Sequence, residues 1–548
     1  MWIGDDPNVV IDAAYEGKPV TRIAGRAFEA EERLESVVIP DSVKEIGYSA
    51  FSYCGNLTQV QFSRNLEIID DEAFRGCVKL QEAVLPDSVQ GFGRRVFGDC
   101  TALRSFYIPK AVRSMHPANF RNCISLEGFT ISPENEYYMV EDGVLYTRDQ
   151  TALLLYPGAR GGRAFTIPET VKGIEEEAFG PTKYLREVTI PKNLTTDWEN
   201  GMTIDGLCFM GNTLENFFVE EGNAEFASLD GVLYTASFPQ LLVYPGGRTD
   251  ATYVMPEGSS FGQGAFSGNQ HLTYLEIPES ASRIPNETFR GCHKLEKVKL
   301  PSTLYRIGDR AFFDCVNLRE IDFPGELGFI GESAFAGCDL RFAYIPGTPS
   351  LDYDCFSNNP NLRTVVLSPE VDQIAWYAFQ NCDVLETVVI PGKNVEIGSV
   401  DDGAGADNEV FGKHHTLWRE HPVTLFGPAG GSAQRYEDKC ELSFRELRLA
   451  PAGAAAKQGD AQWSVNAEFR NYTDAAVNGV TASAALYDEN GVLCGVKQLP
   501  LVMDAQGQTK LAFEIETDSE PVSGKLFVWG TEQDLAPEFP ISEILFPE

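Results

Sequence analysis

The chain has 548 residues and a formal net charge of −36 at pH 7, with 44 lysines and arginines against 80 aspartates and glutamates. Because binding to nucleic acids and to anionic membrane surfaces depends on lysine and arginine, this composition argues against both as partners. No apolar run approaches the roughly 18 residues needed to cross a bilayer. A chain of 548 residues is also longer than a single hydrophobic core usually supports, unless that core extends linearly along a stack.

A repeat organises the chain from its start to about residue 412. In residues 40–57, Val43, Ile46, Ala50 and Phe51 follow a roughly helical spacing, and a turn and a short strand come after them. A fixed period predicts a solenoid, because one copy cannot bury its apolar faces alone but stacked copies can. A constant period of about 23 residues separates the phenylalanines within each of two runs: Phe28, Phe51, Phe74, Phe97 and Phe120, then Phe266, Phe289, Phe312 and Phe335.

Short strands are expected between these phenylalanines, for example over residues 34–39, 80–85 and 103–108. Several end at a proline, which donates no backbone hydrogen bond and therefore ends a strand. Residues 17–28 match the repeat with nothing polar to cap them upstream, and residues 1–6 lack the features of a signal peptide. We therefore expect that the chain begins within a repeat and that a leader has been removed.

The twelve cysteines do not follow the pattern of a disulfide framework. Cys208 and Cys355 directly precede a repeat phenylalanine, whereas Cys440 and Cys494 fall outside the repeat and are left unassigned. A position that recurs with every rung is a packing position, so we expect buried free thiols there rather than metal ligands. Eight cysteines lie three residues after a repeat phenylalanine: Cys54, Cys77, Cys100, Cys123, Cys292, Cys315, Cys338 and Cys382.

Two insertions, near residues 134–158 and 222–246, interrupt the repeat and resemble each other. Each holds two apolar runs joined by a short polar link, which predicts a β-hairpin. We expect each hairpin to widen its rung, and ligand binding is the alternative. Four positions correspond at a constant offset: Gly143, Tyr146, Tyr156 and Pro157 match Gly231, Tyr234, Tyr244 and Pro245.

The repeat ends with an expected cap near residues 423–445, made of a strand, a glycine turn, a short helix from Ser432 and a last strand. Residues 446–548 lose the repeat. Strands are expected there at residues 462–471, 480–487, 492–498, 510–516 and 525–529, with a hairpin turn at residues 488–491. About seven strands in roughly 100 residues predict an all-β sandwich of immunoglobulin or fibronectin type.

The repeat P-x-x-V-x-x-I-G-x-x-A-F-x-x-C-x-x-L-x-x-V-x-I-P resembles the BspA-like leucine-rich repeats of bacterial surface proteins over about residues 9–445. The D-G-V-L-Y and G-S-A-x-x-Y segments are similar to features of the same family. The resemblance implies an α/β-type leucine-rich-repeat solenoid of short parallel strands with turns or short helices. It also implies a secreted or surface-displayed protein that adheres to host proteins or other cells, without shared catalytic residues. No C-terminal anchor of such proteins is visible before Glu548.

Three sequence signals of catalysis or metal binding have a simpler explanation. Ser260 stands in a G-x-S-x-G pattern, but Phe261 and Gly262 fill the repeat positions of Ile46 and Gly47, which argues against a hydrolase. The histidines at 414, 415 and 421 have no cysteine pair at metal spacing, and the aspartates at 401, 402 and 407 lack a calcium-loop pattern. We therefore expect no catalytic site, metal or cofactor.

The leading functional hypothesis is a monomeric, non-enzymatic binding module whose outward-facing strand residues contact a host or neighbouring-cell protein or glycan. In each strand the leucine, valine and isoleucine point inward, and the residues beside the central apolar one point outward onto the concave sheet. A structural spacer that displays other domains is the alternative. The candidate contact residues are Tyr107, Phe218, Tyr274, Glu276, Lys297, Lys299, Glu320, Asp322, Phe342 and Tyr344.

Overall fold

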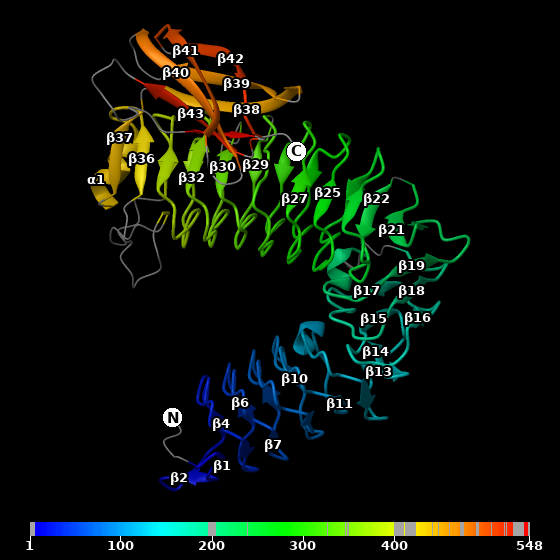
Figure 1. Ribbon diagram of the computed structural model, residues 1–548. Coiled ribbons are helices and arrows are strands. Elements are labelled where there is room, and N and C mark those ends of the chain that lie inside the picture. The colour runs from blue at the N-terminus through cyan, green and yellow to red at the C-terminus, as the bar shows by residue number, and fades with distance from the viewer. Residues whose placement is uncertain are drawn as a thin grey trace. The chain divides into compact units, whose positions relative to one another are not determined.

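The computed structural model forms two compact units, Met1–Leu295 (the first unit) and Glu296–Glu548 (the second unit). Each is a stack of short parallel strands with almost no helix, so the predicted solenoid is confirmed (Figure 1). The structure describes residues 6–195, 204–237, 239–325, 327–345, 347, 350–398, 410–411, 423–440, 442–447, 449–459, 461–471, 476–488, 493–505, 507–519, 521, 523–529 and 542–545.

Each regular rung of the first unit contributes one strand to a strand side, where the strands pair in parallel. Successive rungs pair in register, as in Ser105 with Gly128 and Tyr107 with Thr130. The strands are shorter than expected because a rung needs only two to four paired residues before the chain turns away. They are β1 (Asn8–Val10), β5 (Ser36–Val38), β7 (Gln59–Gln61), β9 (Glu82–Ala83), β11 (Ser105–Ile108), β12 (Gly128–Ile131), β16 (Ala164–Thr166), β18 (Glu187–Ile190), β19 (Asn216–Val219), β23 (Thr252–Val254) and β25 (Tyr274–Glu276).

A second set of short strands lies elsewhere on each rung, at the repeat position of Ile46. The order β10-β8-β6-β4 shows that these strands also stack one rung upon the next. They are β4 (Arg22–Ile23), β6 (Glu45–Ile46), β8 (Ile68–Ile69), β10 (Gly91–Phe92), β17 (Gly173–Ile174), β24 (Ser260–Phe261) and β26 (Arg283–Ile284), and a small hairpin of β2 (Ala14–Tyr15) and β3 (Lys18–Pro19) precedes them.

The segment around each repeat phenylalanine, here called the turn side, forms turns and not the helix that the spacing of Val43 to Phe51 suggested. Ser49 and Tyr53 have positive φ angles of 51° and 58°, which interrupt a right-handed helix on both sides of Phe51. The backbone N–H groups of Ser49, Phe51 and Tyr53 donate to carbonyls of the next rung at 2.9, 2.8 and 2.6 Å. Hydrogen bonds between rungs therefore replace those within a helix. The short helices described are η1 (Pro117–Phe120), η2 (Gly206–Phe209) and α1 (Ser432–Cys440).

The repeat phenylalanines stack along the core. Phe51 is fully buried and lies between Phe28 and Phe74, with ring centroids 4.9 and 5.1 Å away and ring planes within 7°. In the second unit Phe312 and Phe335 stack in the same way at 4.9 Å. Such offset ring pairs add to the free energy gained from burying apolar area, so each rung stabilises its neighbours.

The repeat cysteines complete this core, and the prediction of buried free thiols is confirmed for all eight. The Cys77 thiol donates to the carbonyl of Phe51 in the preceding rung at 3.2 Å, and Cys100 repeats this contact with Phe74. Burial raises the pKa of Cys54, Cys100 and Cys292 to about 12. These thiols therefore stay protonated at neutral pH and act as small packing groups.

Each insertion forms antiparallel strands whose hairpin tip lies between two rungs on the strand side. The carbonyl of Gly143 at the first tip accepts from the N–H of Phe129 at 3.0 Å, and that of Gly231 accepts from Phe217 at 2.8 Å. Each tip therefore accepts the hydrogen bond that a strand of the next rung would accept. The strands before and after each tip consequently belong to separate sheets. The inserted strands are β13 (Tyr138–Glu141), β14 (Val144–Thr147), β15 (Ala152–Leu155), β20 (Phe226–Leu229), β21 (Val232–Thr235) and β22 (Gln240–Val243).

The tyrosine directly after the last inserted strand returns the chain to the regular stack in both insertions. Tyr156 stacks on Phe179 at 5.3 Å and Tyr244 stacks on Phe266 at 4.9 Å, so a tyrosine occupies the phenylalanine position in these two rungs. The first unit bends along its length (Figure 1). Figure 1 shows β6 and β10 on the inner side of this bend and β7 and β11 on the outer side. The strand face is therefore not the concave face here, contrary to expectation.

The second unit continues the same construction. The expected strand, helix and strand near residues 423–445 are β36, α1 and β37, and β36 pairs in parallel with β37. Its strand side holds β27 (Lys297–Lys299), β30 (Phe342–Ile345), β32 (Thr364–Leu367), β34 (Thr387–Val389), β36 (Thr424–Gly427) and β37 (Ser443–Glu446), and its short strands are β28 (Arg306–Ile307), β29 (Phe329–Ile330), β31 (Ser350–Leu351), β33 (Gln373–Ile374) and β35 (Glu396–Ile397).

The C-terminal strands pair in the order β41-β40-β43-β44-β38-β39-β42. All these pairs are antiparallel except β38 with β44. Trp463, Phe469, Leu486, Phe513 and Leu526 are buried in a core that these strands share. The strands are β38 (Leu449–Gly459), β39 (Gln462–Asn471), β40 (Val477–Tyr487), β41 (Leu493–Met503), β42 (Gln508–Glu516), β43 (Ser523–Trp529) and β44 (Ser542–Leu545).

Candidate functional site

The strand face of the first unit carries four of the predicted contact residues. Phe218 in β19 is 49% exposed, and Tyr107 in β11 is half-buried. Tyr274 and Glu276 are the two outward residues of β25 and are also half-buried. The buried residue between them, Leu275, shows that the alternation of inward and outward positions is as predicted. Their contact with a ligand stays a prediction.

Three exposed valines on the same face were missed in the sequence. Val10, Val84 and Val254 are 71%, 70% and 62% exposed, at or next to the ends of β1, β9 and β23. Val254 pairs in register with Glu276, so it shares the outward row of the predicted residues. The sequence held a signal for these valines, because in each of the three strands an apolar residue directly follows the inward-facing one.

Four charged candidates lie at the start of the second unit. Lys299, Glu320 and Asp322 are exposed, and Lys297 is half-buried. Exposed Glu320 and Asp322 alternate with Ile321 and Phe323, each only 8% exposed. These four side chains therefore have the outward orientation that the repeat pattern predicts.

Phe342 and Tyr344 are placed differently from the other candidates. Both pack against an apolar cluster of Val366, Val389, Phe426 and Leu447 within the second unit. Burial raises the pKa of the Tyr344 hydroxyl, and the nearby Glu468 raises it further. Their rings thus cover outward apolar residues of β32, β34 and β36, which leaves less of their surface for a ligand.

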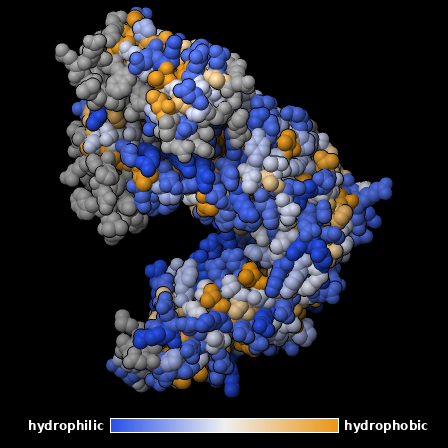
Figure 2. Space-filling view, viewed as in Figure 1, coloured by the Kyte–Doolittle hydropathy of each residue, from blue (hydrophilic) through white to orange (hydrophobic). Residues whose placement is uncertain are grey.

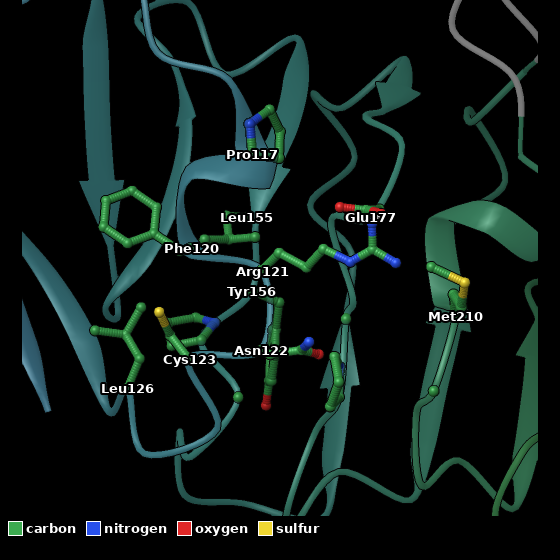
Figure 3. Close-up of a pocket in the computed structure, with 15 residues that line it drawn as sticks. Pro117, Phe120, Arg121, Asn122, Cys123, Leu126, Leu155, Tyr156, Glu177 and Met210 are labelled. Carbon is green, nitrogen blue, oxygen red and sulfur yellow. Dashed lines mark ion pairs between the residues drawn. The ribbon is translucent and has the colours of Figure 1, made fainter. Parts of the chain in front are cut away.

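A cavity of ≈ 170 Å³ lies where the first hairpin interrupts the phenylalanine stack. Its wall includes Phe120, Cys123 and Leu126 from one rung and Tyr156 and Pro181 from later segments. Figure 3 shows Phe120, Cys123 and Leu126 on one side of this space and Met210 on the other. Its volume is close to that of an apolar cavity able to hold a benzene ring, so a small apolar group fits here.

One ion pair stands at the edge of this cavity. The Arg121 guanidinium is 3.1 Å from the Glu177 carboxylate, and Figure 3 shows the two side chains next to each other. The second carboxylate oxygen of Glu177 is buried without a hydrogen-bond partner among the described residues. Burial raises the pKa of the adjacent Glu176, and the carboxylates of Glu177 and Glu287 raise it further. Burial also raises the pKa of Asp205 to about 6.

The pattern around Ser260 does not form a nucleophile elbow. Ser260 lies in the two-residue strand β24, which pairs with β22 and leads into a turn, whereas a nucleophile elbow needs a helix there. Among the described residues, no three histidine, cysteine, aspartate or glutamate side chains gather as metal ligands. The histidines at 414, 415 and 421 and the aspartates at 401, 402 and 407 lie outside the described residues.

The outer surface is mainly hydrophilic. Figure 2 shows that hydrophobic residues on the visible face are scattered among polar and charged ones. Within the described part of the chain, no helix combines the length and the apolar character that a membrane span requires.

Comparisons with solved structures find bacterial leucine-rich-repeat proteins. A leucine rich cell surface protein from Faecalibacterium prausnitzii A2-165 is 26% identical, covering 72% of this chain and 88% of that chain, with a TM-score of 0.35. A leucine-rich repeat protein from Eubacterium ventriosum is 21% identical over 61% of this chain and 82% of its own, with a TM-score of 0.37. The pneumococcal vaccine antigen PcpA is 20% identical, covering 80% of this chain and 87% of that chain, with a TM-score of 0.34.

No curated protein is similar enough to count as a match. The protein family described as "BspA type Leucine rich repeat region" matches in six copies, over residues 21–140, 162–228, 254–356 and 282–400. These segments cover more than half of the chain. They also contain the stacked phenylalanines and most of the buried cysteines described above. The chain therefore belongs to the BspA type leucine-rich repeat family.

Proposed function

We propose that this chain is a non-enzymatic extracellular binding module that recognises a protein or a glycan through the strand face of its solenoid. The observation that carries the proposal is a set of exposed apolar side chains at equivalent outward positions of three sheets of the first unit, with Val84, Phe218 and Val254 between 49% and 70% exposed. A rigid stack of strands offers such side chains with little conformational entropy left to lose on binding. The partner is a host or neighbouring-cell protein or glycan.

Family membership supports an extracellular location, because BspA-like proteins are typically secreted or displayed on a surface. The net charge of −36 agrees with a solvated exterior that resists non-specific association with nucleic acid. The aromatic ring of Phe218 supports a contact role, because rigid rings provide a large contact area at low entropic cost. The charged candidates Lys299, Glu320 and Asp322 would then select the partner by charge.

The same proposal divides the chain into a repeat domain, residues 1–445, and a C-terminal domain, residues 446–548. Strands β38–β44 would form an immunoglobulin- or fibronectin-like sandwich, and the alternating burial of β39 and β42 supports two opposed faces. The packing of Phe342 and Tyr344 against Leu447 supports a fixed attachment between the last rungs and the start of this domain.

A structural spacer is the second candidate function. It is favoured by the extensive stacking of rungs, such as Phe312 on Phe335, which stiffens the chain whether or not it binds a ligand. The two candidates differ in whether a specific partner exists.

The test is a binding screen of the full chain against extracellular-matrix proteins and a glycan array. The binding module predicts at least one saturable partner at micromolar concentration or below. The absence of any saturable partner across the panel would favour the spacer.

A further inference from the structure

The turn side of the first unit holds a second cavity, next to the apolar one. Its volume is ≈ 260 Å³ and its lining is mainly polar: Arg75, Arg95, Gly98, Asp99, Arg121, Asn122 and Arg290. Arg121 and Asn122 line both cavities. Four guanidinium groups and a single carboxylate thus line one space in a chain whose net charge is −36.

These arginines come from rungs that are far apart in the sequence. Arg75, Arg121 and Arg290 each follow a repeat phenylalanine directly, and Arg95 lies two residues before Phe97. The bend of the first unit toward its turn side brings the rung of Phe289 to the rungs of Phe74, Phe97 and Phe120.

Carboxylates behind the arginines hold them in place. The Glu72 and Glu287 carboxylates lie 3.1 Å from Arg75 and 2.7 Å from Arg290, respectively, and neither glutamate lines the cavity. Asp99 accepts from Arg75 Nε at 3.1 Å and from Asn122 Nδ2 at 2.7 Å, so both of its oxygens are engaged. The guanidinium groups of Arg75 and Arg290 are therefore held in place before any ligand arrives, which lowers the entropic cost of binding.

Donor groups remain for a ligand. Among the described residues, Arg75 Nη2 has no hydrogen-bond partner, and neither do Nε and Nη2 of Arg121. In the part of the chain that the structure describes, Glu72 is the one carboxylate paired with Arg95, at 3.8 Å, and the Arg95 side chain is 45% exposed. Partly buried guanidinium groups with free N–H donors are the usual partners of tetrahedral oxyanions, which they bind in a fork.

We propose that this cavity binds a sugar that carries a sulfate or phosphate ester. The ester oxygens accept from Arg75, Arg95 and Arg121. At about 30 Å³ for each water, the cavity has room for roughly nine waters, more than the five heavy atoms of a sulfate group require. The remaining wall is hydrophilic and includes Asn122, whose amide has a second N–H and a carbonyl oxygen for sugar hydroxyls besides its bond to Asp99. The site lies on the turn side and is separate from the strand face.

The test is calorimetric titration of the full chain with N-acetylglucosamine 6-sulfate, N-acetylglucosamine 6-phosphate, unmodified N-acetylglucosamine and sodium sulfate. Binding of at least one ester is expected, weakening as sodium chloride is raised, with no binding of the unmodified sugar. The two esters distinguish a sulfated from a phosphorylated ligand. Sodium sulfate binding as tightly as the better ester would overturn the assignment to a sugar.

Arg95→Gln removes one lining charge at an exposed position, and Arg94→Gln makes the same change at an exposed neighbour that does not line the cavity. Loss of one charge-assisted hydrogen bond is expected to raise the Kd of the ester about tenfold in Arg95→Gln and to leave Arg94→Gln unchanged. Equal weakening by both variants, or by neither, would overturn the site. A variant of the strand face is expected to keep ester binding, so the two proposals fail independently.

Discussion

Replacing Phe51 with alanine tests the stacked core. Its ring is fully buried between Phe28 and Phe74, 4.9 and 5.1 Å away, so truncation leaves a cavity that neighbouring rungs cannot fill. Loss of a core phenylalanine side chain costs about 3–5 kcal/mol. Phe218→Ala is the matched control in the same unit, because Phe218 is 49% exposed. Fully burying such a side chain contributes about 1.5–3 kcal/mol to stability, and Phe218 is only half buried, so its loss should lower the free energy of unfolding by about 1 kcal/mol.

Urea unfolding followed by circular dichroism measures both costs, and hydrogen exchange locates them along the chain. Because solenoid stability is a sum of rung and interface contributions, the Phe51 variant should lose protection chiefly in its own rung and the two neighbouring rungs. Costs at Phe51 and Phe218 that agree within about 0.5 kcal/mol would refute the assignment of inward and outward faces.

Two further predictions concern pH. Because burial raises the pKa of Cys54, Cys100 and Cys292 from 9.0 to about 12, the unfolded chain loses these protons first as the pH rises. The free energy of unfolding should therefore fall between pH 9 and 12, by about 1.4 kcal/mol per thiol and pH unit. Urea unfolding measures it for the wild type and for a variant with alanine at all three positions. Parallel pH profiles of these two proteins would contradict the prediction. Burial likewise raises the pKa of Asp205 from 3.8 to about 6, so stability should fall as the pH rises from 4 to 6. Asp205→Asn keeps an acceptor for the N–H of Leu207, which lies 2.9 Å from the Asp205 carboxylate. The variant should be more stable than the wild type at pH 7 by about 2–3 kcal/mol, measured by thermal unfolding. A variant less stable than the wild type would contradict the raised pKa of Asp205.

The repeat itself could be predicted from the sequence because its causes are local. A phenylalanine that recurs at a constant spacing, followed by a cysteine three places later, places both in the core whatever the rest of the chain does. The helical interpretation of Val43 to Phe51 failed because apolar spacing does not reveal the left-handed conformations of Ser49 and Tyr53. Neither residue is a glycine, so no sequence signal marked the turn.

The tyrosines of the insertions could have been placed. Tyr156 stands as far before Phe179 as each regular repeat phenylalanine stands before the next, and its ring joins their stack. The bend of the first unit could not be predicted, because it depends on how the inserted strands pack between regular rungs, which periodicity does not show. The arginine cavity follows from that bend and joins Arg75 to Arg290, which lie on opposite sides of both insertions in the sequence and which periodicity does not connect.

The candidate strand face was predicted in part. Alternation gave the outward direction of Phe218 and Tyr274, but it could not show that Phe342 and Tyr344 pack against the cluster that includes Leu447. A residue's periodicity sets which side of a strand it faces. What covers that side depends on segments distant in the sequence.

The central claim is that the strand face binds a partner, and its most direct test compares two variants of the first unit. The strand-face variant carries Val84→Thr, Phe218→Thr and Val254→Thr, which remove exposed apolar groups and keep side chains suited to strands. The control variant carries three matching changes of exposed apolar residues away from that face: Ile68→Thr, Val78→Thr and Ile124→Thr, at positions 51%, 42% and 46% exposed.

The measurement is the Kd of each variant for the strongest partner found in the binding screen, by surface plasmon resonance, after circular dichroism has shown that both are folded. The strand-face variant should bind at least about tenfold more weakly than wild type, because exposed aromatic and aliphatic groups at the centre of an interface carry most of its free energy. The control variant should bind as wild type does. Unchanged affinity in the strand-face variant, or equal losses in both variants, would contradict the claim.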